Sequence, residues 1–158
     1  MTNSESLSLK PSGRVPNWWV GAFLLFSFLG FLDSTYLTAK HYLGFSVNCS
    51  LIHGCEEVLN SSYATFFGIP VALAGAIYYV AIFLCLIAFI DRKKFLFWRI
   101  ATLLPVAGFL VTLWLVGVQA FILQAFCLYC LFSAFFTTIL FLLSVYGYHK
   151  GIGRETSV

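Results

Sequence analysis

The sequence has 158 residues, which suits a single domain, and 61% of them are hydrophobic while only 9% are charged. Because soluble domains carry about 25% charged residues, this composition excludes an ordinary water-soluble protein and indicates that lipid is the main solvent. The net charge of +3 is too small to argue for nucleic-acid binding.

The first half of the chain predicts two membrane spans separated by a long polar loop. Residues 1–17 are polar and predict a disordered tail, and residues 18–39 predict the first span, which opens with two tryptophans. Trp is enriched at membrane–water interfaces. Residues 40–65 are polar and rich in turn-forming residues. The uncharged run 66–90 is long enough to span a bilayer, and it places Pro70 in a first helical turn, where the missing N–H costs little.

The second half of the chain predicts two more spans joined by a tight hairpin. A charged loop covers residues 91–99, and residues 100–148 then contain no charged side chain. Because one span needs about 17–25 residues, this stretch must hold two spans. We place the break at residues 119–124, which begin and end with Gln. The expected fold is an all-α membrane protein, a four-transmembrane-helix bundle with a long first extracytoplasmic loop.

The distribution of Lys and Arg predicts the orientation of these helices. Cytoplasmic loops carry an excess of the two residues, and here the long first loop contains only Lys40, whereas the tails and the second loop contain the others. We therefore expect a multi-pass protein of the plasma or inner membrane. Its helical domain would cover residues 18–148, between cytoplasmic tails at 1–17 and 149–158, with the first loop and the last hairpin outside.

A CxxC motif, formed by Cys127 and Cys130, follows the last predicted hairpin and begins the fourth helix. Residues three apart share a helix face, and the free N–H groups and dipole of a helix N-terminus stabilise a thiolate. The motif therefore predicts a reactive dithiol. The alternative is that two small apolar side chains simply pack within a helix.

A second pair, Cys49 and Cys55, lies in the first loop. Taken alone, this pair is more typical of a structural disulfide in an extracellular loop. Both pairs fall on the same predicted side of the membrane, however, and a loop folded over the bundle would bring them within reach of thiol–disulfide exchange. Cys85 lies deep in the second span, and we expect its side chain to contact only the core or lipid.

Asp33 is the only charged residue predicted inside a span. An acid within a membrane helix is a candidate functional residue. We nevertheless favour a structural role, a hydrogen bond between helices near the outer end of the first helix.

These motifs resemble the vitamin K epoxide reductase family, in its bacterial branch. The likeness is carried by the two cysteine pairs, by residues 54–64 after the loop pair and by residues 67–70 at the start of the second span, and it extends over about residues 18–148. The DsbB family performs similar chemistry, but it places its CxxC in the first outer loop and its spaced pair in the second. It is therefore the poorer match.

The resemblance implies a membrane quinone-dependent thiol–disulfide oxidoreductase that supports disulfide bond formation. Cys49 and Cys55 would reoxidise a secreted thioredoxin-like (DsbA-like) protein. Cys55 would then pass electrons to Cys127, and the Cys130 thiolate would reduce the quinone, which is ubiquinone, menaquinone or a related molecule. Ser61 matches the family's loop serine near the quinone.

Two departures from the family pattern, and two other hypotheses, complete these expectations. Many bacterial members carry a fused thioredoxin-like domain, whereas this chain ends at Val158, so we expect a separate redox partner. Animal members carry a tyrosine where Ala134 stands here, which weakens the case for epoxide reduction.

One alternative is a metal-binding membrane protein whose ligands are Cys49, His53, Cys55 and the CxxC. The other is a purely structural, disulfide-linked bundle.

Overall fold

The computed structural model describes residues 16–44, 55–66, 68–92 and 94–150. Its elements, in chain order, are α1 (Asn17–Leu43), α2 (Cys55–Leu59), β1 (Thr65–Phe66), β2 (Ile69–Pro70), α3 (Val71–Arg92), α4 (Phe95–Gly117), the π-helical segment η1 (Val118–Leu123) and α5 (Leu128–His149). The predictions for Cys49, for His53 and for most of both tails lie outside the described residues.

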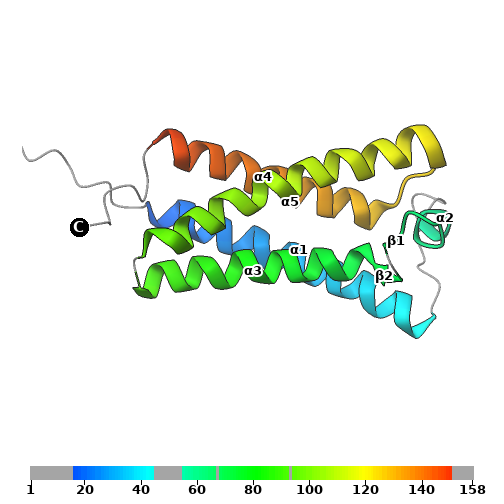
Figure 1. Cartoon of the computed structure of the whole chain (residues 1–158), viewed down its shortest axis with the longest axis horizontal. Coiled ribbons are helices and arrows are strands. Elements are labelled where there is room, and N and C mark those ends of the chain that lie inside the picture. Colours follow the sequence, from blue (N-terminus) through cyan, green and yellow to red (C-terminus); the bar gives the residue numbers. More distant parts are fainter. Residues whose placement is uncertain (1–15, 45–54, 67, 93, 151–158) are drawn as a thin grey trace, which may run out of the picture.

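Four of these elements form the predicted bundle. The described residues contain four helices that are long and apolar enough to cross a membrane: α1, α3, α4 continued by η1, and α5. They run alternately up and down, so that each neighbour in sequence is also a neighbour in space (Figure 1). A helix satisfies its backbone hydrogen bonds within itself, which is why such segments are stable in lipid. The predicted fold class is confirmed.

The hydrophobic core fills the end of the bundle where both described termini lie (Figure 1). Trp19 at the start of α1 packs on Phe23 and on Trp98 at the start of α4, with ring centroids 4.7 and 5.0 Å away. Its indole Nε1–H donates to the Leu143 carbonyl of α5 at 3.0 Å. Because this end is tightly packed, any large cavity must lie toward the other end.

That other end, on the right in Figure 1, carries the short helix α2, the β1–β2 hairpin and η1. The break between the last two spans was predicted near residues 119–124, but the third span continues through η1 to Leu123 and the break lies at residues 124–127. There the chain leaves the helix through η1, and Gln124 adopts a left-handed conformation with φ of 50°. The reversal aims the N-terminus of α5 back into the bundle.

Several predicted boundaries are wrong, including the end of the first span, since α1 continues to Leu43 and does not stop at residue 39. The second helix begins at Val71, not at residue 66, because Thr65–Phe66 pairs antiparallel with Ile69–Pro70. Gly68, with φ of 78°, supplies the turn that this hairpin needs. The predicted charged loop at 91–99 is also shorter, since α4 already begins at Phe95. Near Pro70 local sequence allowed either a loop or a helix, and pairing within the hairpin decided between them.

Candidate active site

The CxxC motif opens helix α5 as predicted. Cys127 is the N-cap residue, with extended backbone angles, and its side chain accepts a hydrogen bond from the Cys130 N–H at 3.4 Å. The Cys127 N–H, which a helix start would otherwise leave unpaired, donates to Oε1 of the buried Gln119 at 3.2 Å. The first turn of α5 is thus anchored to η1 through this side chain.

The first motif cysteine, Cys127, has a perturbed pKa. Both motif cysteines are free thiols among the described residues. A hydrogen bond from the Cys130 thiol is the largest influence on Cys127 and lowers its pKa, helped by the N–H groups of Cys130 and Tyr129 and opposed by burial and by Asp33. A low-pKa thiolate at a helix N-terminus was expected. The lowered pKa favours the thiolate form at Cys127, whereas the sequence prediction had assigned the thiolate to Cys130.

Cys55 lies beside this motif. The side chain is 1% exposed, and it belongs to one buried cluster with Val58, Ala125 and the fully buried Cys127. Cys55 is disulfide-bonded. Its predicted partner, Cys49, lies outside the described residues. The first loop therefore does bring one of its cysteines to the CxxC, because α2 packs against η1 at this end of the bundle.

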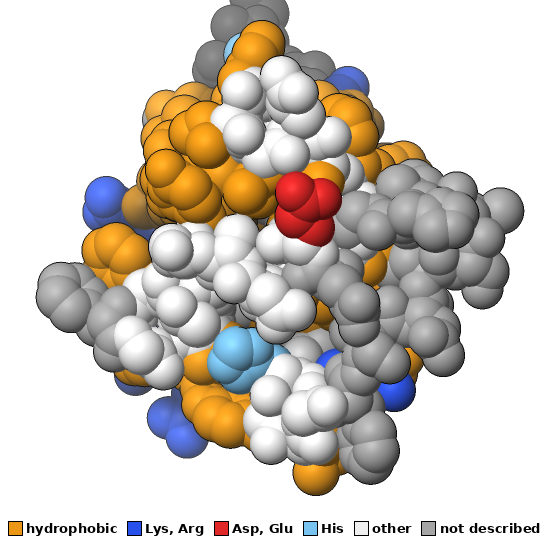
Figure 2. Space-filling view, turned by 90° about the vertical axis from the view of Figure 1, so that its right-hand side faces the viewer, with side chains coloured by type: hydrophobic (Ala, Val, Ile, Leu, Met, Phe, Trp, Pro, Cys, Tyr) orange, Lys and Arg blue, Asp and Glu red, His pale blue; other side chains and the backbone are white. Residues whose placement is uncertain are grey.

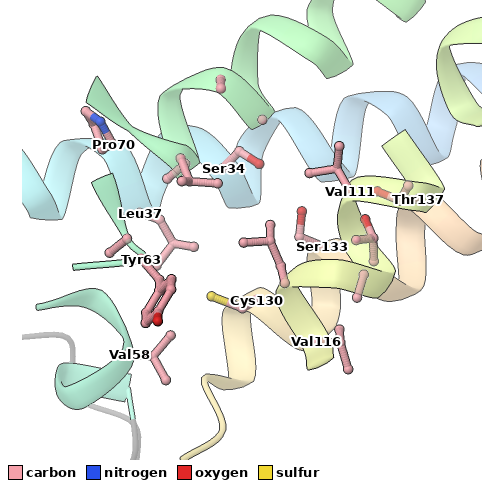
Figure 3. A pocket seen from close by; sticks show the side chains of 18 of the residues that line it. Ser34, Leu37, Val58, Tyr63, Pro70, Val111, Val116, Cys130, Ser133 and Thr137 are labelled. Atoms are coloured by element: carbon pink, nitrogen blue, oxygen red, sulfur yellow. The ribbon is translucent and has the colours of Figure 1, made fainter. Parts of the chain in front are cut away.

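A cavity of about 370 Å³ lies between the helices at the same end. Most of its wall is aliphatic or aromatic. The Cys130 sulfur points into it from the start of α5, toward Val58 and Tyr63, and Ser133 and Thr137 follow on the same helix (Figure 3). Cys127 is absent from the wall. The two sulfurs of the motif thus face different surroundings, Cys127 toward Cys55 and Cys130 toward the cavity.

Two neighbouring tyrosines of α3 give the cavity a polar wall. The Tyr79 hydroxyl donates to the Ser133 carbonyl at 2.8 Å, and it lies 3.0 Å from Ser133 Oγ and 2.8 Å from Thr137 Oγ1. The Tyr78 hydroxyl also lies near Thr137, but it is buried and has no hydrogen-bond partner among the described residues. Tyr79 therefore links α3 to α5, whereas the Tyr78 hydroxyl is available for a hydrogen bond to a ligand.

Glycines on the facing helices make room for these rings. A Cβ atom at Gly108 of α4 would collide with the Tyr78 hydroxyl, and a Cβ atom at Gly30 of α1 would collide with the Tyr79 ring. Close helix approach at small residues is common in membrane bundles. The two tyrosines are thus held by shape as well as by hydrogen bonds.

The other predicted residues have distinct positions. Ser61 lines the cavity, and its hydroxyl donates to the Val58 carbonyl at 2.7 Å. Cys85 is a half-buried free thiol in the middle of α3. Within the described residues no group of three or more His, Cys, Asp or Glu side chains could hold a metal ion. Cys49 and His53, which the metal-site hypothesis needs, lie outside those residues.

Asp33 does not make the predicted interhelical hydrogen bond. Its Oδ2 atom is buried and has no hydrogen-bond partner in the part of the chain that the structure describes. Hydroxyl groups elsewhere on α1 donate to carbonyls of the same helix. Ser27 bonds the Leu24 carbonyl and Thr38 bonds the Ser34 carbonyl, both within α1 itself.

Comparison with known proteins decides the family. The sequence profile described as "Vitamin K epoxide reductase family" matches residues 21–145, which is most of the chain. The chain belongs to the vitamin K epoxide reductase family. The matched residues include most of every described span and the whole cavity wall.

A curated relative comes from a plant. The chain is 33% identical over 123 residues to the "Thiol-disulfide oxidoreductase LTO1" of Arabidopsis thaliana. That alignment covers 72% of this chain but only 32% of the relative, so the chain spans about a third of the relative's length. The assignment to a bacterial branch stays a prediction.

Sequence reasoning missed three contributors to the site. Gln119 was used only to mark a chain break, yet it accepts the hydrogen bond of the Cys127 N–H. Tyr78 and Tyr79 were not singled out, although adjacent aromatic hydroxyls in an uncharged span are a polar signal. The positions of Gly30 and Gly108 carry no such signal, because they acquire meaning only from the tyrosine ring that each glycine faces.

Proposed function

We propose that this protein is a membrane thiol–disulfide oxidoreductase that reoxidises a secreted thioredoxin-like (DsbA-like) protein and passes the electrons to a membrane quinone. The observation that carries this proposal is the position of the CxxC between two environments. Cys127 is buried against Cys55 of the first loop, and Cys130 lines an apolar cavity within the span region. Membership of the family and the name of the plant relative support the same activity.

The loop pair, Cys49 and Cys55, would receive electrons from the partner protein. The partner dithiol reduces the loop disulfide, and the freed Cys55 thiolate attacks Cys127 of the Cys127–Cys130 disulfide. Cys130 is released as the leaving group and takes a proton. A second attack within the loop closes the loop disulfide again and leaves the CxxC as a thiolate and a thiol, which matches the hydrogen bond that Cys130 donates to Cys127.

The cavity residues fit a quinone as the oxidising substrate. A volume of about 370 Å³ falls within the range of about 300–1,000 Å³ that is usual for small-molecule sites. A quinone ring is apolar apart from its carbonyl oxygens, and the unpaired Tyr78 hydroxyl offers a hydrogen-bond donor in an otherwise mostly apolar wall. Ser61 would lie near the ring. The quinone would be ubiquinone, menaquinone or a related molecule.

The charge distribution supports an extracytoplasmic site. Arg92, Lys94, Arg99 and Lys150 lie at the helix ends that form the opposite side of the bundle. Figure 2 looks onto the end that carries the site, and Lys and Arg side chains do not gather on its described part. By the positive-inside rule, both tails would be cytoplasmic, with the catalytic domain at residues 18–148 in a plasma or inner membrane.

Quinone reduction by the purified full chain tests the proposal. With a reduced thioredoxin-like donor and a soluble quinone, the wild type should form quinol. Cys49→Ala, Cys55→Ala, Cys127→Ala and Cys130→Ala should each lower the rate at least about 100-fold, because each breaks the only covalent route for electrons. Cys85→Ala is the matched control and should be unaffected. Normal turnover in Cys127→Ala or Cys130→Ala would refute the proposal.

A further inference from the structure

Asp33 is a half-buried acid that the proposed electron route does not use. It lies on α1 directly before Ser34, which lines the cavity. Its Oδ2 atom is buried without a hydrogen-bond partner among the described residues. Burying a carboxylate without a partner costs much more free energy than burying the neutral acid. An acid at this position therefore calls for a functional explanation.

The groups that face Asp33 come from the two helices packed against α1, namely α3 and α5. Tyr36, three residues after Asp33 on α1, packs on Tyr129 between the two motif cysteines, with ring centroids 5.2 Å apart. The titratable groups on α3 and α5 that face this part of α1 are therefore Tyr79, Cys127, Tyr129 and Cys130. None of these four side chains is a cation. A carboxylate at Asp33 and a thiolate at Cys127 therefore repel each other across a poorly solvated region, and the two charges oppose each other's formation.

We propose that Asp33 is the proton carrier of the CxxC pair, holding a proton while Cys127 is a thiolate and releasing it when the Cys127–Cys130 disulfide forms. This inference rests on the proposed quinone-linked function. Under this proposal, Asp33 and Cys127 together carry one negative charge at every stage. The charge is on Cys127 when the motif is reduced and on Asp33 when the motif is oxidised. The Asp33 carboxylate and the Cys127 thiolate are therefore never both charged at the same time.

The step balances in atoms and electrons. When the Cys127 thiolate and the Cys130 thiol form their S–S bond, two electrons pass to the quinone. Its two oxygens gain two protons, one from the Cys130 thiol and one from the Asp33 carboxyl, which leaves quinol, a disulfide and a carboxylate. When the loop dithiol reduces the motif again, its two protons return to Cys130 and Asp33.

Infrared difference spectroscopy of the full chain tests this inference without quinone. Reducing the oxidised protein with dithiothreitol should produce the C=O band of a newly protonated carboxyl, which shifts in D2O. The band should be lost in Asp33→Asn and kept in Asp91→Asn, which removes an exposed acid at the other end of α3. Asp33→Glu should keep a carboxyl band at a changed position. This variant replaces Asp33→Asn in the test if the Asn variant does not fold.

A kinetic arm separates this inference from the proposed function. Exchange between the donor protein and the loop pair should be unchanged in Asp33→Asn, whereas quinol formation should fall about 100-fold, the usual loss for a missing proton donor. A carboxyl band in a wild type that forms no quinol would support the proton carrier and refute the quinone. A wild type that forms quinol, with the same band and rate in Asp33→Asn, would refute the proton carrier alone.

Discussion

The adjacent residues Tyr78 and Tyr79 allow the same substitution to be tested in two environments. In Tyr79→Phe the lost hydroxyl is one that contacts the Ser133 carbonyl, Ser133 Oγ and Thr137 Oγ1 at 2.8–3.0 Å. Thr137 is 3% exposed, and its hydroxyl would lose its bond to Tyr79. In Tyr78→Phe the lost hydroxyl has no partner in the described structure. The two variants should therefore differ in stability although their composition is identical.

The expected magnitudes follow from these contacts. Leaving one buried polar group unpaired costs about 1–3 kcal/mol, but interhelical hydrogen bonds in membranes average only about 0.6 kcal/mol and reach about 1.7 kcal/mol. We expect Tyr79→Phe to lower the free energy of unfolding by about 1–2 kcal/mol. Tyr78→Phe should change it by less than about 0.5 kcal/mol, as is usual where no interaction is lost.

The assay is unfolding in mixed micelles by increasing denaturing detergent, followed by helical circular dichroism in the absence of quinone. A second measurement, the KM for a soluble quinone, should show the reverse order, because Tyr78 offers its free hydroxyl to the substrate. Equal destabilisation by the two substitutions would refute the reasoning about the hydrogen-bonded wall. An unchanged KM in Tyr78→Phe would remove that hydroxyl from the quinone site.

Three further predictions concern the helix start and its neighbours. Because the pKa of Cys127 is lowered, its thiolate should stabilise the reduced fold fully above the ordinary thiol pKa of about 8.5, and this stabilisation should fade as the pH falls through the lowered value. Unfolding midpoints of the reduced wild type and Cys127→Ser, compared across pH, test the sign. Gln119→Leu should cost about 1–3 kcal/mol, since the Cys127 N–H loses its acceptor, and the same unfolding assay measures it. Gly108→Ala should cost about 1–3 kcal/mol through its collision with the Tyr78 ring, whereas Gly117→Ala, which meets open space, should be neutral in parallel measurements.

Several features were accessible from sequence because they depend on short stretches of chain. The hydropathy of a span is summed over about 20 residues, so the four helices could be found one at a time, while the break between the last two was placed a few residues too early. The position of the CxxC at a helix start depends on the same local signal. The resemblance to the family was also carried by short runs, and it agrees with the profile match over residues 21–145.

The boundaries near Pro70 and Phe95 were less accessible. Pro70 is equally compatible with a first helical turn and with the end of a strand. Its pairing with Thr65 across the hairpin decided the matter.

What the sequence alone determined is the membrane environment, the number of spans and the presence of two cysteine pairs, because these follow from composition and local order. Only the tertiary structure decided which thiol faces which surroundings. Cys127 is buried against Cys55 while Cys130 lines the cavity, and Asp33 is left without its expected partner. Those relations depend on which faces of α1, α3 and α5 meet, and helix rotation about its axis is set by packing between distant segments.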